Sequence, residues 1–400
     1  MRPDPRLRAA LAAATGDVIL YDLAGIAGQY ANLLRELPGV SVRFAMKACP
    51  VDEVLATLAA AGAGFDAASP NEIARAVATG VPVDRIHYGN TVKSDRQIAE
   101  AHALGIRDFA TDCLADVAAI AAAAPGSRVF CRLATSGEGA LWGLSRKFGC
   151  SAAEAVRVLT AAREVGLVPA GLSVHVGSQQ MQAEGWQAAF DTLADVLAGL
   201  RTAGIAVDHV NLGGGLPAAG CLDKRGRPLE PPLEKIFTVI REGRQRLCEV
   251  AGTPLDFLIE PGRYLVADHG AIRAEVLRLS EREQLGGERG HWLYLSCGKF
   301  NGLYEMDELQ YPLLFPGREG EPLVPAAVAG PTCDSDDAFW HERDRGLVPV
   351  PAGLASGDPV WVLSCGAYAT SYLTQGFNGF TPLPYRCLPV DDPLDAEAGS

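Results

Sequence analysis

The sequence predicts an α/β protein: a (β/α)8 TIM barrel plus a C-terminal β-sandwich or β-barrel-like domain that also takes the N-terminal strand. Three observations support this. Eight short β-rich runs alternate with helical segments, each run ends in a polar or glycine feature, and after Arg263 long helical periodicity fades. We expect residues 26–265 to form the barrel, and residues 1–25 with 266–400 to form the β domain.

The predicted barrel strands are short and mainly apolar, as strands covered on both faces of a parallel sheet are. They are Val42–Met46, Gly64–Asp66, Arg85–Tyr88, Ile106–Ala110, Arg128–Leu133, Leu172–Val176, Val207–Leu212 and Phe257–Ile259. Helical spacing marks the intervening stretches Val51–Ala61, Asn71–Thr79, Asp95–Ala103 and Ala152–Val165. Strands that alternate with helices pair in parallel, and eight such units indicate a closed barrel.

The predicted β domain is rich in proline and glycine turns, such as the turn over residues 285–290. Its strands are Ala271–Arg282, His291–Cys297, Pro325–Val328 and Pro359–Cys365, and the early strand Val18–Leu23 joins them. Residues 384–400 are predicted to be a polar tail.

Composition excludes several classes of function. The chain has 400 residues, 48% hydrophobic and 21% charged, with a net charge of −13, which disfavours nucleic acid as a partner. Its ten cysteines form no CxxC pair, so we expect reduced thiols and a cytoplasmic protein. No apolar run reaches membrane-spanning length, and the N-terminal segment lacks a convincing secretory core. No metal ion is expected.

Each predicted strand carries a polar or glycine feature at its end or just beyond it: Lys47, Asp66, Asn90, Asp112, Arg132, His175, the Gly213, Gly214 and Gly215 run, and Glu260. The carboxyl ends of all strands of such a barrel open on one face, where catalytic groups gather. Asp66 and Asp112 are each equally well explained as helix N-caps.

Lys47 ends an apolar strand, so we expect its amine to be buried. A buried amine loses its charge easily and can attack a carbonyl, which is the chemistry of a Schiff base.

Two further segments suggest the ligand of such a lysine. Gly213, Gly214 and Gly215 permit a close approach of backbone amides to a phosphate, although a plain loop explains them equally well. Glu260 and Arg263 flank a rigid Pro-Gly turn. Either Glu260 pairs with a protonated ring nitrogen while Arg263 clamps a phosphate, or the two form an internal salt bridge.

Three other residue patterns have both a chemical and a structural reading. His175 with Ser178 suits ring stacking and a phosphate contact, whereas a lone strand histidine is usually a core residue. We interpret Arg132 as an internal partner for an acid such as Asp66. In the segment 330–337, Cys333 can donate a proton and its aspartates can bind a cation, or the segment is an Asp-rich turn.

Together these residues resemble the alanine-racemase-fold (type III) pyridoxal-phosphate decarboxylases of the ornithine, lysine and diaminopimelate group, and most of all ornithine decarboxylase. The matching stretches occur in the family's order. They are 44–48 (FAMKA), 64–69 (GFDAAS), 144–149 (LSRKFG), 175–178 (HVGS), 213–215 (GGG), 260–264 (EPGRY), 330–335 (GPTCDS), 366–368 (GAY) and 377–380 (FNGF).

The resemblance implies a role for each matching position. Lys47 would hold pyridoxal 5′-phosphate as a Schiff base, Glu260 would pair with the pyridine nitrogen and His175 would stack on the ring. The resemblance also implies cofactor contacts from Asp66, Arg132, Ser178, Gly213, Gly214, Gly215, Gly262, Arg263 and Tyr368. Cys333 would protonate the product, and the substrate contacts would be Cys333, Asp334, Asp337, Glu305 and Phe377. An obligate homodimer with its active sites at the interface is implied.

The expected reaction is decarboxylation of a basic diamino acid, ornithine or a close analogue, as in polyamine biosynthesis. The alternatives are another substrate (lysine, diaminopimelate, a D-amino acid or an intermediate of specialised metabolism such as a siderophore precursor) and a non-catalytic homologue that binds the cofactor. Glu305 stands where eukaryotic ornithine decarboxylases have an aspartate, so the length of the substrate pocket stays open.

Overall fold

The computed structural model describes residues 4–143, 147–283, 287–339 and 347–390. It divides into two compact units. The barrel unit comprises Gln29–Pro217 and Pro231–Gly262, and the β unit comprises the chain up to Gly28, Ala218–Glu230 and the chain from Arg263 onward. Our boundaries placed Ala218–Glu230 in the barrel. Leu222 instead exchanges two backbone hydrogen bonds with Gln310, at 2.9 and 3.0 Å, which ties this segment to the β unit.

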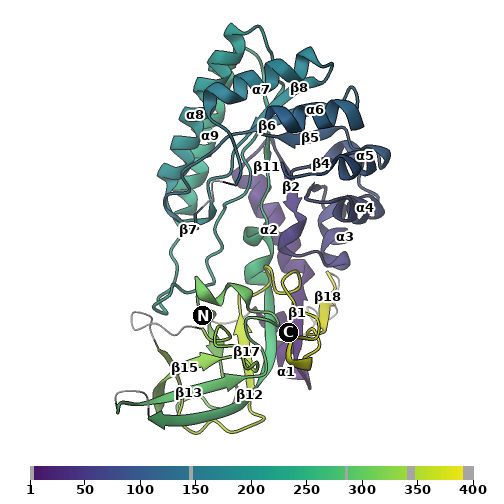
Figure 1. Ribbon diagram of the computed structural model, residues 1–400. Coiled ribbons are helices and arrows are strands. Elements are labelled where there is room, and N and C mark those ends of the chain that lie inside the picture. The colour runs from purple at the N-terminus through teal and green to yellow at the C-terminus, as the bar shows by residue number, and fades with distance from the viewer. Residues whose placement is uncertain (1–3, 144–146, 284–286, 340–346, 391–400) are drawn as a thin grey trace, which may run out of the picture. The chain divides into compact units, whose positions relative to one another are not determined.

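The barrel unit is a closed ring of parallel strands in the order β10-β11-β2-β3-β4-β5-β6-β8 (Figure 1). The strands are β2 (Val40–Ala45), β3 (Gly64–Ala67), β4 (Ile86–Tyr88), β5 (Asp108–Thr111), β6 (Arg128–Arg132), β8 (Val168–Ser173), β10 (His209–Asn211) and β11 (Asp256–Ile259). All eight predicted strands are confirmed. The prediction for β8 was shifted toward the C-terminus, since the chain has left the strand by Val174 and His175 lies beyond its end.

Helices surround this ring: α2 (Leu23–Glu36), α3 (Asp52–Ala60), α4 (Pro70–Ala78), α5 (Asp95–Ala103), α6 (Leu114–Ala123), α7 (Ala152–Glu164), α8 (Ala183–Thr202) and α9 (Leu233–Ala251). Local sequence fixes several of their starts. Ser69 and Ser151 accept hydrogen bonds from the backbone of α4 and α7, and Ser94 forms a capping box with Gln97 at α5. None of the helices in the described ranges is long and apolar enough to cross a lipid bilayer.

The interior of the barrel contains polar side chains in place of the branched aliphatic residues that usually fill it. The Phe130 ring lies between two histidine rings, with its centroid 5.2 Å from that of His87 and 5.7 Å from that of His209. Arg43 on β2 is also largely enclosed, with 12% of its side chain exposed. Buried polar groups need partners, so this interior constrains which charges can coexist there.

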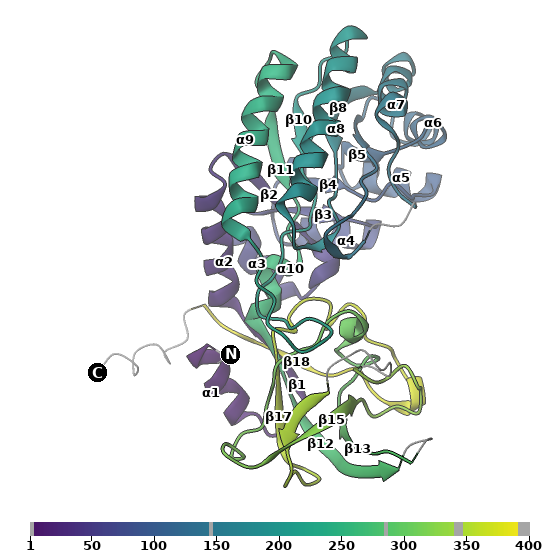
Figure 2. The same ribbon diagram turned by 90° about the vertical axis from the view of Figure 1, so that its left-hand side faces the viewer.

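The β unit is built on a mixed sheet with the path β14-β17-β12-β13-β15-β16. Figure 2 labels four of these strands, β12, β13, β15 and β17. Its strands are β12 (Gly270–Glu283), β13 (Arg289–Leu295), β14 (Leu313–Leu314), β15 (Leu323–Ala329), β16 (Val348–Pro351) and β17 (Pro359–Leu363). As predicted, the early strand β1 (Val18–Asp22) joins this sheet, antiparallel to β12. A two-stranded antiparallel sheet of β7 (Ala140–Trp142) and β9 (Ser178–Gln180) belongs to the barrel unit, and α10 (Arg263–Val266) to the β unit.

One prediction for the β unit is wrong. Residues 384–400 were expected to be a tail, but β18 (Tyr385–Leu388) pairs in parallel with β1. Its sequence gave little signal, because Tyr385 and Arg386 are exposed and only Leu388 is buried. Residues 391–400 lie outside the described ranges.

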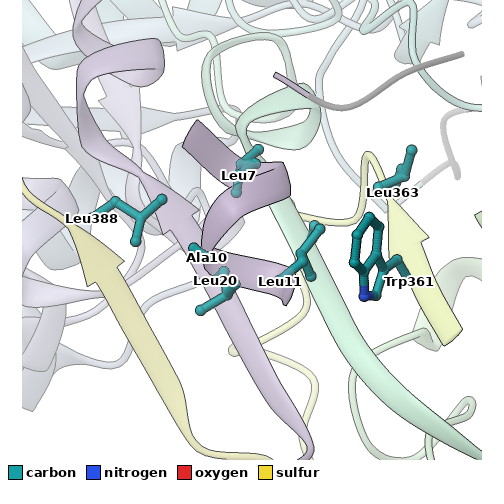
Figure 3. Close-up of a cluster of buried hydrophobic side chains, with 8 residues drawn as sticks. Leu7, Ala10, Leu11, Leu20, Trp361, Leu363 and Leu388 are labelled. Carbon is teal, nitrogen blue, oxygen red and sulfur yellow. The ribbon is translucent and has the colours of Figure 1, made fainter. Parts of the chain in front are cut away.

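Helix α1 (Pro5–Ala13) packs on this sheet through a stripe of small and aliphatic side chains (Figure 3). Asp4 caps it by accepting a hydrogen bond from the Arg6 amide at 2.8 Å, and Pro5 occupies its first position. Leu7, Ala10 and Leu11 are buried against Leu20, Ala271, Trp361, Leu363 and Leu388. The cluster therefore joins segments from both ends of the chain.

We predict that Leu11→Ala destabilises the β unit by about 2–5 kcal/mol, because Leu11 is 1% exposed and its loss leaves a cavity. Chemical denaturation would measure the change. Leu277→Ala is the matched control, since Leu277 of the same unit is 39% exposed, and its effect should stay within about 0.5 kcal/mol. Equal effects of the two substitutions would contradict this packing.

Candidate active site

The predicted site residues divide between the two units. The barrel unit contains the residues expected to bind the cofactor ring and its phosphate: Lys47, Asp66, Arg132, His175, Ser178, Gly213, Gly214, Gly215, Glu260 and Gly262. The β unit contains those expected to bind substrate, together with two further cofactor contacts: Arg263, Glu305, Cys333, Asp334, Asp337, Tyr368 and Phe377. Part of the matching stretch 144–149 lies outside the described residues.

Lys47 lies in a single 3-10 turn, Met46–Ala48, directly after β2. Met46 and Ala48 are buried, whereas Lys47 is exposed, so the expectation of a buried amine is wrong. The turn directs the two apolar neighbours into the core and Lys47 away from it. Its charge still contributes to lowering the pKa of Asp66 and of His175, which places the amine in the electrostatic field of the barrel's carboxyl-terminal face.

A second lysine near a strand end shows the contrasting arrangement. The Lys93 side chain is fully buried, and its Nζ lies 2.7 Å from Asp116 Oδ2 and 2.7 Å from the Ala110 carbonyl oxygen. An amine engaged in this way is a structural cation. The exposed Lys47 is therefore the better candidate for a nucleophile.

The centre of the barrel's carboxyl-terminal face is a group of two acids joined by a histidine. His87 Nε2 lies 2.8 Å from Glu260 Oε1 and 3.2 Å from Asp66 Oδ1. The Asn211 amide donates to the same Glu260 oxygen at 2.5 Å. Gly89 leaves room for this group, because a Cβ there would lie 1.9 Å from Asp66 Oδ1.

Asp66 and His87 each favour the charged form of the other. Burial alone would raise the pKa of Asp66, but the hydrogen bond and charge of His87, with Lys47 and Arg132, lower it. For His87, burial and the Arg43 charge favour the neutral form. The hydrogen bonds to Asp66 and Glu260 outweigh them and raise its pKa, so the imidazole holds its proton more tightly than a free histidine.

His175 lies against the glycine loop. Its Nδ1 accepts a hydrogen bond from the Gly177 amide at 3.0 Å, and a Cβ on Gly214 would lie 3.0 Å from its Nε2. Burial, followed by the charges of Lys47 and Arg132, lowers the pKa of His175 to about 3. The ring is therefore neutral at physiological pH, as a ring that stacks on an aromatic ligand should be.

The glycine loop has no room for side chains. Gly213 has φ +67°, and a Cβ there would lie 2.0 Å from the Val174 carbonyl oxygen. Gly215 has φ +112°, and its Cβ would lie 2.6 Å from the Gly177 carbonyl oxygen. Only glycine fits both the conformation and the space. The loop thus keeps bare backbone beside His175 and Ser178.

Two other predicted strand-end residues, Asn90 and Asp112, form local hydrogen bonds with the backbone. Asn90 donates to the Ala68 carbonyl oxygen at 3.3 Å, and Asp112 accepts from the Gly149 amide at 2.9 Å. Neither Asp66 nor Asp112 is an N-cap, since Ser69 and Cys113 occupy those positions. Arg132, interpreted as an internal partner for an acid such as Asp66, is one of the charges that lower the pKa of Asp66. Its guanidinium lies 4.8 Å from the Phe148 ring centroid, and the direct hydrogen-bond partner of Asp66 is His87.

In the β unit, Arg263 forms a buried two-pronged ion pair with Glu305, and its guanidinium lies 5.1 Å from the Tyr368 ring centroid. Burial alone would lower the pKa of Arg263, but the Glu305 carboxylate raises it. The acid of this ion pair is Glu305, so it differs from the Glu260–Arg263 bridge considered from the sequence. This geometry weighs against Glu305 as a direct substrate contact.

The segment around Cys333 contains both exposed acids and a buried, hydrogen-bonded acid. Cys333, Asp334 and Asp336 are exposed, and the Asn378 side chain accepts a hydrogen bond from the Cys333 amide at 2.9 Å. Asp337 is 2% exposed and accepts hydrogen bonds from the Thr332 amide, the Thr332 hydroxyl and the Lys299 amide. This geometry argues against Asp337 as a substrate ligand and indicates that it shapes the turn. Phe377 packs on Phe300 with ring centroids 4.7 Å apart.

Sequence reasoning missed His87 and Asn211. His87 was hidden because it lies inside the predicted strand Arg85–Tyr88 rather than at its end. A signal existed, since a polar residue between the buried Ile86 and Tyr88 points to the opposite face of the strand, which in a barrel is the interior.

A cavity of about 720 Å³ opens at the opposite, amino-terminal ends of the strands. None of the predicted site residues lines it. Its charged residues pair with one another: Arg128 lies 2.7 Å from Asp108 and 2.9 Å from Asp208, and Asp208 lies 2.9 Å from His209 Nδ1. The carboxyl-terminal face therefore remains the candidate site.

Similarity to known proteins agrees with this geometry. The family model described as pyridoxal-dependent decarboxylase, pyridoxal binding domain, matches residues 23–267. The lysine/ornithine decarboxylase of Selenomonas ruminantium is 30% identical over 369 residues, 92% of this chain and 88% of that protein. The ornithine decarboxylase of Mus musculus is 27% identical over 372 residues, 90% of this chain and 77% of that protein.

A solved structure shares the whole architecture. The lysine/ornithine decarboxylase of Vibrio vulnificus complexed with putrescine superposes with a TM-score of 0.82 at 28% identity, over 97% of this chain and 100% of that one. The family match, with the lysine at a strand end, the carboxylates and the glycine loop of this barrel, identifies a pyridoxal-phosphate-dependent enzyme. The chain belongs to the pyridoxal-dependent decarboxylase family, and it is an amino-acid decarboxylase.

The residues present fit pyridoxal phosphate. The barrel unit provides an exposed amine, a carboxylate held by two donors, a neutral imidazole and a loop of bare backbone amides. These match the cofactor's aldehyde, ring nitrogen, aromatic face and phosphate in turn.

We predict that His175 weakens the folded apoprotein in acid. The pKa of His175 is about 3 in the folded protein and about 6.5 in the unfolded chain. Below pH 6.5 the unfolded chain therefore binds a proton at this residue and the folded protein does not, which favours unfolding. His175→Gln should therefore lose less stability between pH 6.5 and 4 than the wild type, by on the order of 1 kcal/mol per pH unit. Denaturation at a series of pH values measures this, with His291→Gln as control. Parallel curves for wild type and His175→Gln would contradict the assignment.

Proposed function

We propose that the protein decarboxylates ornithine or a close diamino analogue and releases the amine and CO2. The observation that supports a cationic substrate best is the state of Asp334. Its carboxylate is exposed, and no lysine or arginine of the described chain pairs with it. Nearby acids are engaged, since Lys299 lies 2.5 Å from Asp307 and 3.8 Å from Asp336. A distal ammonium group would complete this site, whereas a distal carboxylate would be repelled.

In this proposal the barrel residues bind and orient the cofactor. Lys47 attaches it covalently, Glu260 holds the proton of its ring nitrogen, and the neutral His175 packs against its ring. The amides of Gly214 and Gly215 bind the phosphate together with Ser178, because the Gly213 amide already donates to Asn211. Arg263 and Tyr368 would add to phosphate binding, with Arg263 exchanging Glu305 for that contact. The bound cofactor supplies an electron sink for the bond to the departing carboxylate.

The β unit would bind the rest of the substrate and deliver a proton. The exposed Cys333 thiol is the proposed proton donor to the α-carbon, and Asp334 is the proposed contact for the distal amine. Both side chains lie on a turn fixed by Asn378 and Asp337. Their exposure on that turn supports our further proposal that the enzyme works as a homodimer, with this segment serving an active site at the interface.

We predict that the purified protein with pyridoxal phosphate has a visible absorption band that Lys47→Ala abolishes, because the substitution removes the amine that attaches the cofactor. Lys235→Ala is the control, since Lys235 lies on the outer helix α9 and pairs with Glu184. The control should keep the band. Persistence of the band in Lys47→Ala would overturn the assignment.

We predict that Asp334→Asn lowers kcat/KM for ornithine roughly 10- to 100-fold, because it removes one charge-assisted contact. Asp336→Asn is the matched control, since Asp336 is also exposed but lies near Lys299. CO2 release should be measured with both enantiomers of ornithine and lysine, and with arginine, diaminopimelate and carboxylated polyamines. A preference for diaminopimelate, or no difference between the two variants, would refute the proposed role of Asp334.

A further inference from the structure

His87 links two strands that are not neighbours in the barrel. It lies on β4, whereas Glu260 follows β11, and strands β2 and β3 stand between them in the ring. The His87 side chain is 1% exposed, so it crosses the interior rather than the surface. Its Nε2 meets Glu260 at 2.8 Å and Asp66 at 3.2 Å, which places one N–H between two carboxylates.

The partners of Glu260 occupy only one of its oxygens. His87 Nε2 and Asn211 Nδ2 both meet Oε1, at 2.8 and 2.5 Å, and within the described ranges no hydrogen bond falls on Oε2. The carboxylate is thus fixed in rotation while its second oxygen stays available to accept a bond. Because the Nδ2 group of Asn211 can only donate, Oε1 is an acceptor in this arrangement.

The two acids need a cation between them. The interacting atoms of Asp66, His87 and Glu260 lie within 4.8 Å of one another. Two carboxylates this close in a largely buried site do not both stay ionised unless a positive charge compensates them. Arg43, Arg132 and Lys47 also act on these acids through their charges. Among the described residues, His87 is the cation in direct contact with both acids.

We propose that His87 is a positioning residue that keeps Glu260 ionised, holds it through Oε1 and thereby reserves Oε2 for the proton of the cofactor's ring nitrogen. This inference rests on the proposed role of Glu260. Without a charge at position 87, Asp66 and Glu260 would share one proton. Glu260 would then be partly neutral and would hold the ring-nitrogen proton less firmly, which weakens the electron sink while leaving the covalent attachment at Lys47 intact.

If His87 acts through its charge, turnover should depend on the protonation of His87. Its neighbours on the packed elements are Asp66, Glu260, Arg43 and the uncharged Phe130 ring, and the two acids raise the pKa of His87 above its ordinary value. The positive charge of His87 is therefore fully present below the ordinary histidine pKa. It is lost as the pH rises through the raised pKa of His87. Turnover should fall on the alkaline side for this reason.

The test uses the loaded enzyme and three variants. His87→Gln keeps a donor but removes the charge, and His87→Phe removes both. His209→Gln is the matched control, because His209 flanks the other side of the same Phe130 ring and pairs with Asp208. We expect kcat to fall about tenfold or more in His87→Gln and further in His87→Phe, with cofactor affinity changed less than threefold and the alkaline loss of turnover removed. His209→Gln should behave as wild type.

A readout independent of turnover is the infrared spectrum of the same proteins at neutral pH. His87→Gln should show a new protonated-carboxyl band that wild type and His209→Gln lack, and Asp66→Asn in the His87→Gln background should remove it. Absence of that band, or retention of the wild-type alkaline profile in His87→Gln, would overturn the inference.

Glu260→Gln separates this inference from the proposed function. If Glu260→Gln leaves turnover unchanged, the proposed role of Glu260 fails. If it lowers turnover but His87→Gln does not, only the role of His87 fails. In the Glu260→Gln background His87→Gln should have little added effect, and full additivity would count against the coupling.

Discussion

Asp66 and Glu260 place two carboxylates near the mouth of one barrel, and most of the surrounding chemistry compensates for their charge. Burial penalises each acid, so each must meet donors or cations. His87 contacts both, Asn211 fixes one of them, and the charges of Lys47 and Arg132 lower the pKa of Asp66. The same positive charges help to keep His175 neutral. A single electrostatic balance therefore sets the protonation states of both an acid and a base.

In the β unit, the acids are compensated one at a time by separate partners. Glu305 neutralises Arg263, Lys299 lies near Asp307 and Asp336, and Asp337 is satisfied by backbone and hydroxyl donors. Asp334 stands apart from these pairs. The contrast explains why a run of aspartates in sequence is a poor measure of binding capacity, since neighbouring acids have opposite fates once the turn forms.

The sequence predicted the fold well because its signals are local. The barrel strands are short apolar runs that alternate with helices, and α4, α5 and α7 begin at capping serines. These signals can be recognised without knowledge of distant contacts. Strand β18 was missed because its sequence is mostly exposed and its place depends on pairing with β1, more than 360 residues earlier. The same limit applies to the ion pair of Arg263, whose partner Glu305 could not be identified from sequence spacing.

The candidate site was predictable to the extent that it lies at strand ends. Lys47, His175, the glycine loop and Glu260 were found in this way, although the exposure of Lys47 depends on a turn that its sequence did not reveal.

The positions of His87 and Asn211 follow instead from the pleat of the strands. In a barrel, every second residue points inward, so Asn211 lies two residues before Gly213 and His87 two residues before Gly89. The two glycines act differently: the Gly213 amide donates to Asn211 at 2.9 Å, and Gly89 leaves room for Asp66. The layer beneath the strand ends therefore determines the orientation of the acids above it, and a search limited to strand ends finds the reactive groups without the residues that set their charge.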